Sequence, residues 1–257
     1  IFVPSMVSDS VTAYDTETGK EVWRFYADGP VRFAPVAQEG KVYFVSDDGY
    51  LYCLDAKDGD EEWKVRGGPD DRKLIGNGRM ISAWPARGAP VIYDGVLYFA
   101  AGVWPFMGTF IHAVDPSSGQ VLWTNSGSGC NWQGQPHSSP AFAGVAPQGY
   151  LAANDELLLV PGGRSVPGAY ARKTGKFLYF NHEAGKSAGG YHASLFGEYF
   201  VNGNRLYEAK KGAALGSAAR GVFSTNACYY AAGGVLCSGE VSETEKKDRR
   251  GTLQKSV

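Results

Sequence analysis

Histidines and cysteines are the residues of this chain whose types could support metal binding or nucleophilic catalysis. No two histidines have the HExxH spacing that puts two zinc ligands on one helix face. No two cysteines form a CxxC pair, so neither a zinc ribbon nor a thioredoxin-like redox site is indicated. We therefore predict no metal site and no catalytic residue. The residues considered are His112, His137, His182, His192, Cys53, Cys130, Cys228 and Cys237.

Two short segments partly match known ligand-binding loops. Residues 55–62 are acidic like a calcium loop, but an EF-hand needs its glycine at the sixth position, and Gly59 is the fifth residue here. Residues 185–187 read Gly-Lys-Ser, the end of a phosphate-binding loop, but position 180 holds Phe180 where that loop needs glycine. We interpret the first segment as a hairpin turn and reject the second as a phosphate site.

Cys228 and Cys237 flank a segment with the character of a hairpin. If residues 231–234 form the turn, the two cysteines face each other across the strands. Cross-strand neighbours can form a disulfide where their geometry is favourable. A disulfide and a pair of small buried thiols are both open at this point.

Basic and aromatic side chains gather in three Gly-rich or polar loops, at residues 72–88, 102–107 and 130–139. Such side chains are common in binding surfaces, so these loops are the candidate ligand-binding segments. The alternative is that the loops fold on themselves and cover the rims of the sheets. The candidate ligand-binding residues are Arg72, Arg79, Trp84, Arg87, Trp104, Trp132 and His137.

The composition narrows the class of protein. With 25 Lys and Arg against 26 Asp and Glu, the chain lacks the basic excess typical of nucleic-acid binders. No run of 18 apolar residues is present, so we expect no membrane insertion. The 35 glycines, together with 13% aromatic residues, favour many short strands joined by tight turns.

A repeated motif positions these loops. Residues 13–23, 53–63 and 113–123 each place Asp, Gly and Trp at relative positions 0, +4 and +8. Asp15 and Asp55 are 40 residues apart, which is typical of a propeller blade, and Asp115 follows after a further 60. A weaker copy covers residues 170–179, with Arg172 near the Asp position and Tyr179 at the Trp position. A fifth copy, residues 206–212, is faint.

One repeat contains four short strands. Residues 35–65 alternate β-branched and aromatic runs with turns at 38–40, 46–49 and 55–59, which indicates a four-stranded antiparallel meander. We predict an all-β propeller of about five to six blades over residues 1–239. The chain begins inside a unit, so either a late strand closes that blade or the ring is incomplete. Residues 240–257 are highly charged, and we expect a disordered tail or a fragment edge.

The motif Ala-x-Asp-x-x-x-Gly-x-x-x-Trp resembles the repeat of quinoprotein-like propellers, which include PQQ-dependent alcohol dehydrogenases and the BamB-type assembly propeller. The resemblance implies that the motif aromatic residue docks between neighbouring blades. It also implies a periplasmic or otherwise extracytoplasmic location and a place within a longer bacterial multidomain chain. The residues with this implied docking role are Trp23, Trp63, Trp123 and Tyr179.

The resemblance leaves two functions open. A PQQ dehydrogenase of this family needs adjacent cysteines and a carboxylate site for Ca²⁺, and we match neither in this sequence. We therefore predict no bound cofactor and expect a non-catalytic module that binds or scaffolds a protein, peptide or glycan. The alternative is a segment of a PQQ-dependent alcohol or sugar dehydrogenase, with PQQ and Ca²⁺ as cofactors.

Overall fold

The computed structural model describes a chain that is almost entirely β-strand. Its only helical element among the described residues is the short 3₁₀ turn η1, Pro105–Met107. None of the helices described is long and apolar enough to cross a membrane. The described residues are 1–76, 78–128, 130–134, 139–163, 165–180, 189–203, 205–215, 228–232, 235–239, 244–247 and 253–256.

Five antiparallel sheets follow one another along the chain as the blades of a propeller, which confirms the predicted fold. Blade 1 is β1 (Phe2–Ser5), β2 (Ser10–Tyr14) and β3 (Glu21–Tyr26). Blade 2 is β4 (Val36–Gln38), β5 (Lys41–Val45), β6 (Tyr50–Asp55) and β7 (Glu61–Arg66). Blade 3 is β10 (Ala86–Tyr93), β11 (Val96–Ala101), β12 (Phe110–Val114) and β13 (Val121–Asn125), with β16 (Gly149–Tyr150) parallel to β10. Blade 4 is β17 (Ala152–Ala153), β18 (Leu157–Val160), β19 (Gly168–Ala171) and β20 (Phe177–Tyr179). Blade 5 is β21 (Ala193–Phe196), β22 (Tyr199–Asn202) and β23 (Arg205–Glu208).

Four further hairpins lie outside these sheets. Two are insertions in the links between blades, and two lie in the last thirty residues of the chain. The last hairpin lies within residues 240–257, for which we had expected a disordered tail or a fragment edge. They are β8–β9 (Lys73–Gly76, Arg79–Ser82), β14–β15 (Asn131–Gly134, Pro140–Ala143), β24–β25 (Cys228–Ala232, Val235–Gly239) and β26–β27 (Thr244–Lys247, Leu253–Ser256).

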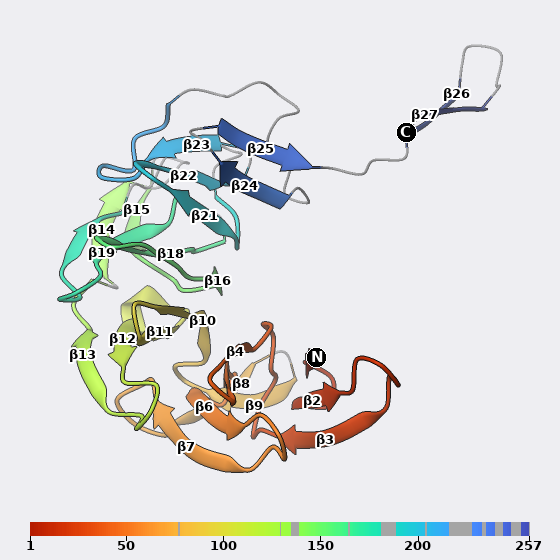
Figure 1. Cartoon of the computed structure of the whole chain (residues 1–257). Helices are drawn as coiled ribbons and strands as arrows, with labels where there is room; N and C mark the ends of the chain where they lie inside the picture. The colour runs from red at the N-terminus through yellow and green to blue at the C-terminus, as the bar shows by residue number, and fades with distance from the viewer. Residues whose placement is uncertain are drawn as a thin grey trace.

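The blades lie along an open arc, with β3, β7 and β13 at its outer edge and β4 and β16 on its inner side (Figure 1). The middle strands of a blade are buried on both faces; residues 42–45 of β5 and 51–54 of β6 are examples. The fourth strand β7 has exposed residues at every second position, as expected of an edge strand facing solvent. The hydrophobic core therefore lies between neighbouring sheets, as where Tyr43 and Leu51 of blade 2 pack with Leu97 and Phe99 of blade 3.

The repeated motif forms the turn between the third and fourth strands. In the first three copies the Gly N–H donates to the Asp carbonyl, for example Gly59 to Asp55 at 3.0 Å. In the fourth copy Gly175 N–H donates to the carbonyl of Ala171 at 2.8 Å. Ala171 therefore occupies the Asp position, directly before Arg172, which the sequence had placed near that position. The turn needs the carbonyl and a glycine at positive φ, and Gly175 has φ +69°.

Each motif aromatic residue lies against the motif turn of the following blade. The indole Nε1 of Trp23 donates to Ala56 O at 3.1 Å, and that of Trp123 donates to Arg172 O at 3.2 Å. Tyr179 uses its hydroxyl in the same way, donating to Ala209 O at 2.5 Å. At these three joints the acceptor is the residue after the Asp position.

The joint between blades 2 and 3 is different. Tyr43 OH donates to Pro116 O at 3.1 Å and so occupies the carbonyl that the motif Trp bonds at other joints. The indole nitrogen of Trp63 is buried without a hydrogen-bond partner in the described part of the chain. The sequence motif predicts the position of Trp63 but not this exchange of donors.

The register of β24 and β25 changes the interpretation of the two late cysteines. Cys228 lies opposite Gly239, and Cys237 lies opposite Tyr230. The first strand extends to Ala232 and the second begins at Val235, so Ala231 and Ala232 belong to a strand and not to the turn that we had assumed. Cys228 and Cys237 are therefore not directly opposite in the ladder.

Candidate functional site

The antiparallel order of the strands divides each blade into two ends. One end, here called the linker end, carries the turns between second and third strands and the links between blades. Residues 27–35, 46–49, 67–76, 78–85, 102–109, 126–128, 130–134 and 139–148 belong to it. The other end, the motif end, carries the motif turns. The candidate ligand-binding residues Arg72, Arg79, Trp84, Arg87, Trp104 and Trp132 all belong to the linker end, and His137 lies outside the described residues.

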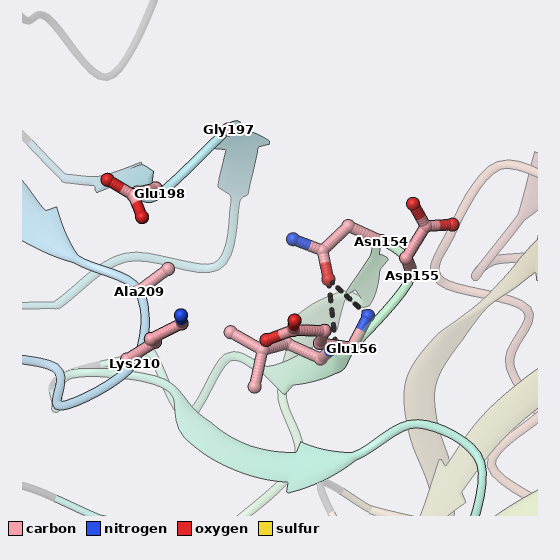
Figure 2. A pocket seen from close by; sticks show the side chains of 8 residues that line it. Asn154, Asp155, Glu156, Gly197, Glu198, Ala209 and Lys210 are labelled. Carbon is pink, nitrogen blue, oxygen red and sulfur yellow. Dashed lines mark hydrogen bonds between the residues drawn. The ribbon is translucent and has the colours of Figure 1, made fainter.

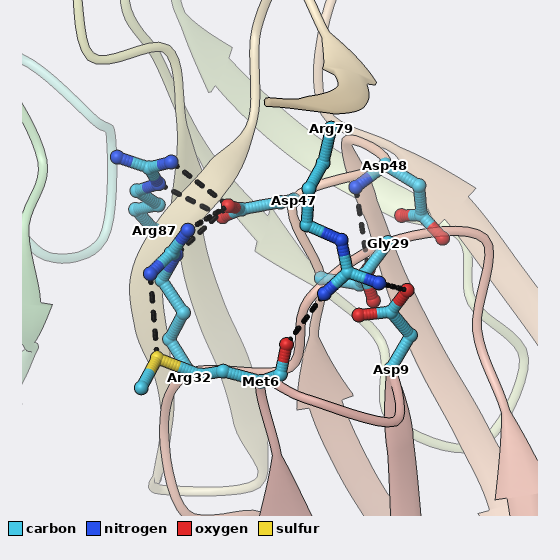
Figure 3. Close-up of polar contacts among 9 residues, drawn as sticks. Met6, Asp9, Gly29, Arg32, Asp47, Asp48, Arg79 and Arg87 are labelled. Carbon is cyan, nitrogen blue, oxygen red and sulfur yellow. Dashed lines mark hydrogen bonds and ion pairs between the residues drawn. The ribbon is translucent and has the colours of Figure 1, made fainter. Parts of the chain in front are cut away.

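Arg32, Asp47 and Arg87 form an ion cluster at the linker end (Figure 3). Arg87 contacts the Asp47 carboxylate through two nitrogens, Nε to Oδ1 and Nη2 to Oδ2, both at 2.8 Å. Arg32 adds Nε and Nη2 to Oδ2 at 2.8 and 2.7 Å. The Asp47 side chain is 0% exposed, whereas those of Arg32 and Arg87 are 25% and 17% exposed. One buried carboxylate therefore holds two guanidiniums that still reach solvent.

Arg79 links the β8–β9 hairpin to blade 1. Its Nη1 donates to Met6 O at 2.6 Å, and its Nη2 forms an ion pair with Asp9 (Figure 3). Arg79 thus belongs to the same end as the Arg32–Asp47–Arg87 cluster and shares Met6 with Arg32, but its ion pair is with Asp9 rather than Asp47.

Trp84 and Arg72 form a second pair in the same link. The Arg72 guanidinium lies 5.4 Å from the centre of the Trp84 ring, a cation–π distance. Trp84 is buried, and its Nε1 donates to the carbonyl of Met107 at 2.8 Å. Trp104 lies immediately before η1, in the loop that accepts this bond. These contacts fix the loop at residues 102–108 against the 67–85 link.

Within the described part of the chain, Trp132 pairs with another aromatic side chain and not with an arginine. It lies on β14 with its side chain 62% exposed, 4.8 Å from Phe142 on β15 in an edge-to-face pair. The β14–β15 hairpin therefore projects apolar surface at the linker end.

An aromatic row formed by Phe33, Tyr150 and His192 connects distant parts of the chain. Phe33 and Tyr150 meet edge to face at 5.2 Å, and Tyr150 lies 5.3 Å from His192. Tyr150 is in β16, on the inner side of the arc (Figure 1). Phe33 follows Arg32 directly in the chain, so the row and the ion cluster share the link between blades 1 and 2.

Two titratable groups with shifted pKa values have structural partners. Burial raises the pKa of the Asp48 carboxyl, which accepts from Tyr52 OH at 2.6 Å. Burial also lowers the pKa of His112 to about 4. The Nε2 atom of His112 lies 2.9 Å from Gly67 O, which can only accept, so this nitrogen carries the proton. Both groups are held by internal hydrogen bonds within and between blades.

A cavity at the motif end is acidic. It lies between the turns of blades 4 and 5, and its lining includes Asp155, Glu156, Glu198 and Lys210 (Figure 2). Among the described residues, no group of three or more His, Cys, Asp or Glu side chains could hold a metal ion. The linker end, where cationic and aromatic side chains come together, is therefore the candidate functional site.

Sequence reasoning missed Arg32 and Asp47. We had interpreted Asp47 only as part of the turn at residues 46–49, and we had assigned no role to Arg32. The available signal was the run Asp47-Asp48-Gly49 between two strongly apolar strands. Both carboxylates of this run are buried, and burying a carboxylate is costly unless a cation or hydrogen bonds compensate for the lost water.

Comparisons with known proteins agree with the fold. A family model described as "Outer membrane protein assembly factor BamB" matches residues 1–129. Tetrathionate hydrolase of Acidithiobacillus ferrooxidans is 30% identical over 200 residues, which are 74% of this chain and 37% of that protein. The chain thus spans a little over a third of this curated relative.

Solved structures show the same architecture. Quinohemoprotein alcohol dehydrogenase from Comamonas testosteroni superposes with a TM-score of 0.61 at 15% identity, over 100% of this chain and 44% of that one. The enzyme ADHIIG from Pseudomonas putida HK5 gives 0.58 at 18% identity, over 83% and 39%. At these identities the likeness shows the fold alone.

Proposed function

The chain belongs to the propeller family described by the outer membrane protein assembly factor BamB, and we propose on that premise that it is a non-catalytic binding module. Its ligand, whether a protein, peptide, glycan or smaller anion, binds at the linker end. The family description supports an extracytoplasmic location. The chain acts there as part of a longer protein, as its 37% coverage of the curated relative suggests.

One observation carries this proposal: cationic and aromatic side chains from three successive blades share the linker end. Arg32, Arg79 and Arg87 bring positive charge, and Trp132 with Phe142 brings exposed aromatic surface. Arginine and tryptophan are the residues most enriched in binding hot spots. The groups with shifted pKa values that could act as acid or base, Asp48 and His112, are occupied in structural hydrogen bonds instead.

The name of the curated relative contains tetrathionate, and this ion is a suitable first probe because it is a dianion. We expect isothermal titration calorimetry to show saturable binding of tetrathionate. Ion chromatography of the same mixture should show no release of thiosulfate or sulfate. Release of these products at a rate proportional to protein concentration would mean that the chain is a hydrolase.

The alternative is a segment of a PQQ-dependent alcohol or sugar dehydrogenase. It is tested by adding PQQ with Ca²⁺ and following tryptophan emission, then alcohol-dependent reduction of an acceptor dye. The binding-module proposal expects no dye reduction. Ca²⁺-dependent saturable quenching together with dye reduction would replace it with the dehydrogenase.

A further inference from the structure

The Arg32–Asp47–Arg87 cluster is assembled from three elements that are distant in the sequence. Arg32 lies in the link between blades 1 and 2, Asp47 in the turn between β5 and β6, and Arg87 near the start of β10 in blade 3. Figure 3 shows the two guanidiniums approaching the Asp47 carboxylate from the same side. The folding of three successive blades therefore places two cations next to each other.

The charges in this cluster do not cancel. Two guanidiniums share one carboxylate, and both lie within 2.8 Å of its Oδ2 atom. Their side chains are three-quarters or more buried, so water screens the excess positive charge only partly. A cluster with one uncompensated, partly desolvated positive charge attracts an anion.

Donor groups remain for that anion. Arg87 uses Nε and Nη2 on Asp47, and its Nη1 has no partner in the described part of the chain. Arg32 likewise uses Nε and Nη2, and its Nη1 contacts only the Met6 sulfur at 3.3 Å, a weak acceptor that an oxyanion can replace. Because Asp47 accepts from both side chains, it fixes the orientation of the two remaining Nη1 groups.

We propose that Arg32 and Arg87 together bind one oxyanion group, a carboxylate, sulfate or phosphate, at the start of the aromatic row of Phe33, Tyr150 and His192. Guanidinium donors match the geometry of such groups, and pairs of charge-assisted hydrogen bonds give both affinity and orientation. This inference rests on the proposed function for the location of the ligand, and it adds the chemistry of the ligand and the residues that hold it.

The test is calorimetric titration of the whole chain with sodium sulfate, phosphate and acetate in separate runs, in a low-chloride buffer of constant ionic strength. The wild-type chain binds at least one of these anions, and the three runs identify which oxyanion fits. In R87Q the affinity for that anion falls by about tenfold or more, the loss of one charge-assisted pair. R32Q provides an independent variant if R87Q does not fold, as judged by far-UV circular dichroism.

R66Q is the matched control. It removes one arginine from the same end and changes the net charge equally, but Arg66 donates to the carbonyls of Gly68 and Pro69 and is not part of the Arg32–Asp47–Arg87 cluster. Its affinity for the anion stays within about twofold of wild type. Equal losses in R66Q and R87Q would show diffuse electrostatics and overturn the site. If tetrathionate binds wild type and R87Q alike, the inference fails while the binding-module proposal stands. If the wild-type chain binds no anion at all, the inference fails, and the binding-module proposal stands only for a protein, peptide or glycan ligand.

Discussion

The contact between a motif tryptophan and the glycine of the next blade can be isolated by comparing two glycines. Gly19 and Gly59 occupy the same position in the first and second motif copies, with φ +67° and +81°. A methyl group on Gly59 would lie 2.6 Å from Cδ2 of Trp23, whereas one on Gly19 would meet nothing within 4 Å. Alanine at either position therefore loses stability because of the positive φ, and only Gly59→Ala adds a collision with the indole.

The magnitudes follow from this difference. A left-handed backbone costs an alanine about 1–2 kcal/mol, and the restricted unfolded chain offsets roughly 0.4–1 kcal/mol of it at both positions. Overpacking a filled site adds about 1–3 kcal/mol. We expect Gly19→Ala to cost at most about 1.5 kcal/mol and Gly59→Ala to exceed it by about 1–3 kcal/mol.

Urea denaturation followed by tryptophan emission measures both variants against wild type, with far-UV circular dichroism as a second probe of whether the transition is cooperative. If the two variants are destabilised equally, the tryptophan does not pack on the following blade as described. The account of how blades are joined would then be wrong.

Two further predictions concern buried polar groups. Because burial lowers the pKa of His112 to about 4, below the usual 6.5 of the unfolded chain, its contribution to stability is complete above about pH 6.5. That contribution is lost as the pH falls towards 4, by up to about 3 kcal/mol. Urea unfolding at pH 7.5 and 4.5 should show it, and His112→Gln should weaken the pH dependence; an unchanged dependence would contradict the assignment. Because Trp63 Nε1 has no partner within the described residues, Trp63→Phe should cost about 1 kcal/mol less than Trp123→Phe, which also loses a hydrogen bond. If thermal unfolding shows that the two variants lose equal stability, Tyr43 does not replace Trp63 as the donor to Pro116 O.

The fold was predictable because its signals are local. The Asp–Gly–Trp spacing encodes a turn with a glycine at positive φ, as Gly19, Gly59 and Gly119 have, and a large aromatic residue four positions later. The fourth copy lacks the motif Asp because the turn uses the backbone carbonyl at that position, which Ala171 supplies equally well. Tyr179 can stand at the Trp position because its hydroxyl donates to the carbonyl that corresponds to the acceptor of the indoles.

The site was less predictable because its contacts are not local. Arg87 was selected for its loop, but its partner Asp47 lies 40 residues earlier, on another blade. Arg72 and Trp84 are close in sequence, yet their stacking depends on the path of the β8–β9 hairpin, which we had treated as loop. Spacing within one repeat cannot show which side chains meet between repeats.

The most direct test of ligand binding at the linker end is a crystal of the whole chain soaked in selenate and measured at the selenium absorption edge. The account predicts an anomalous peak within hydrogen-bond distance of Nη1 of both Arg32 and Arg87, on the side away from Asp47. A selenate bound at Arg79 or at the motif end, with the Arg32–Asp47–Arg87 cluster empty, would contradict it.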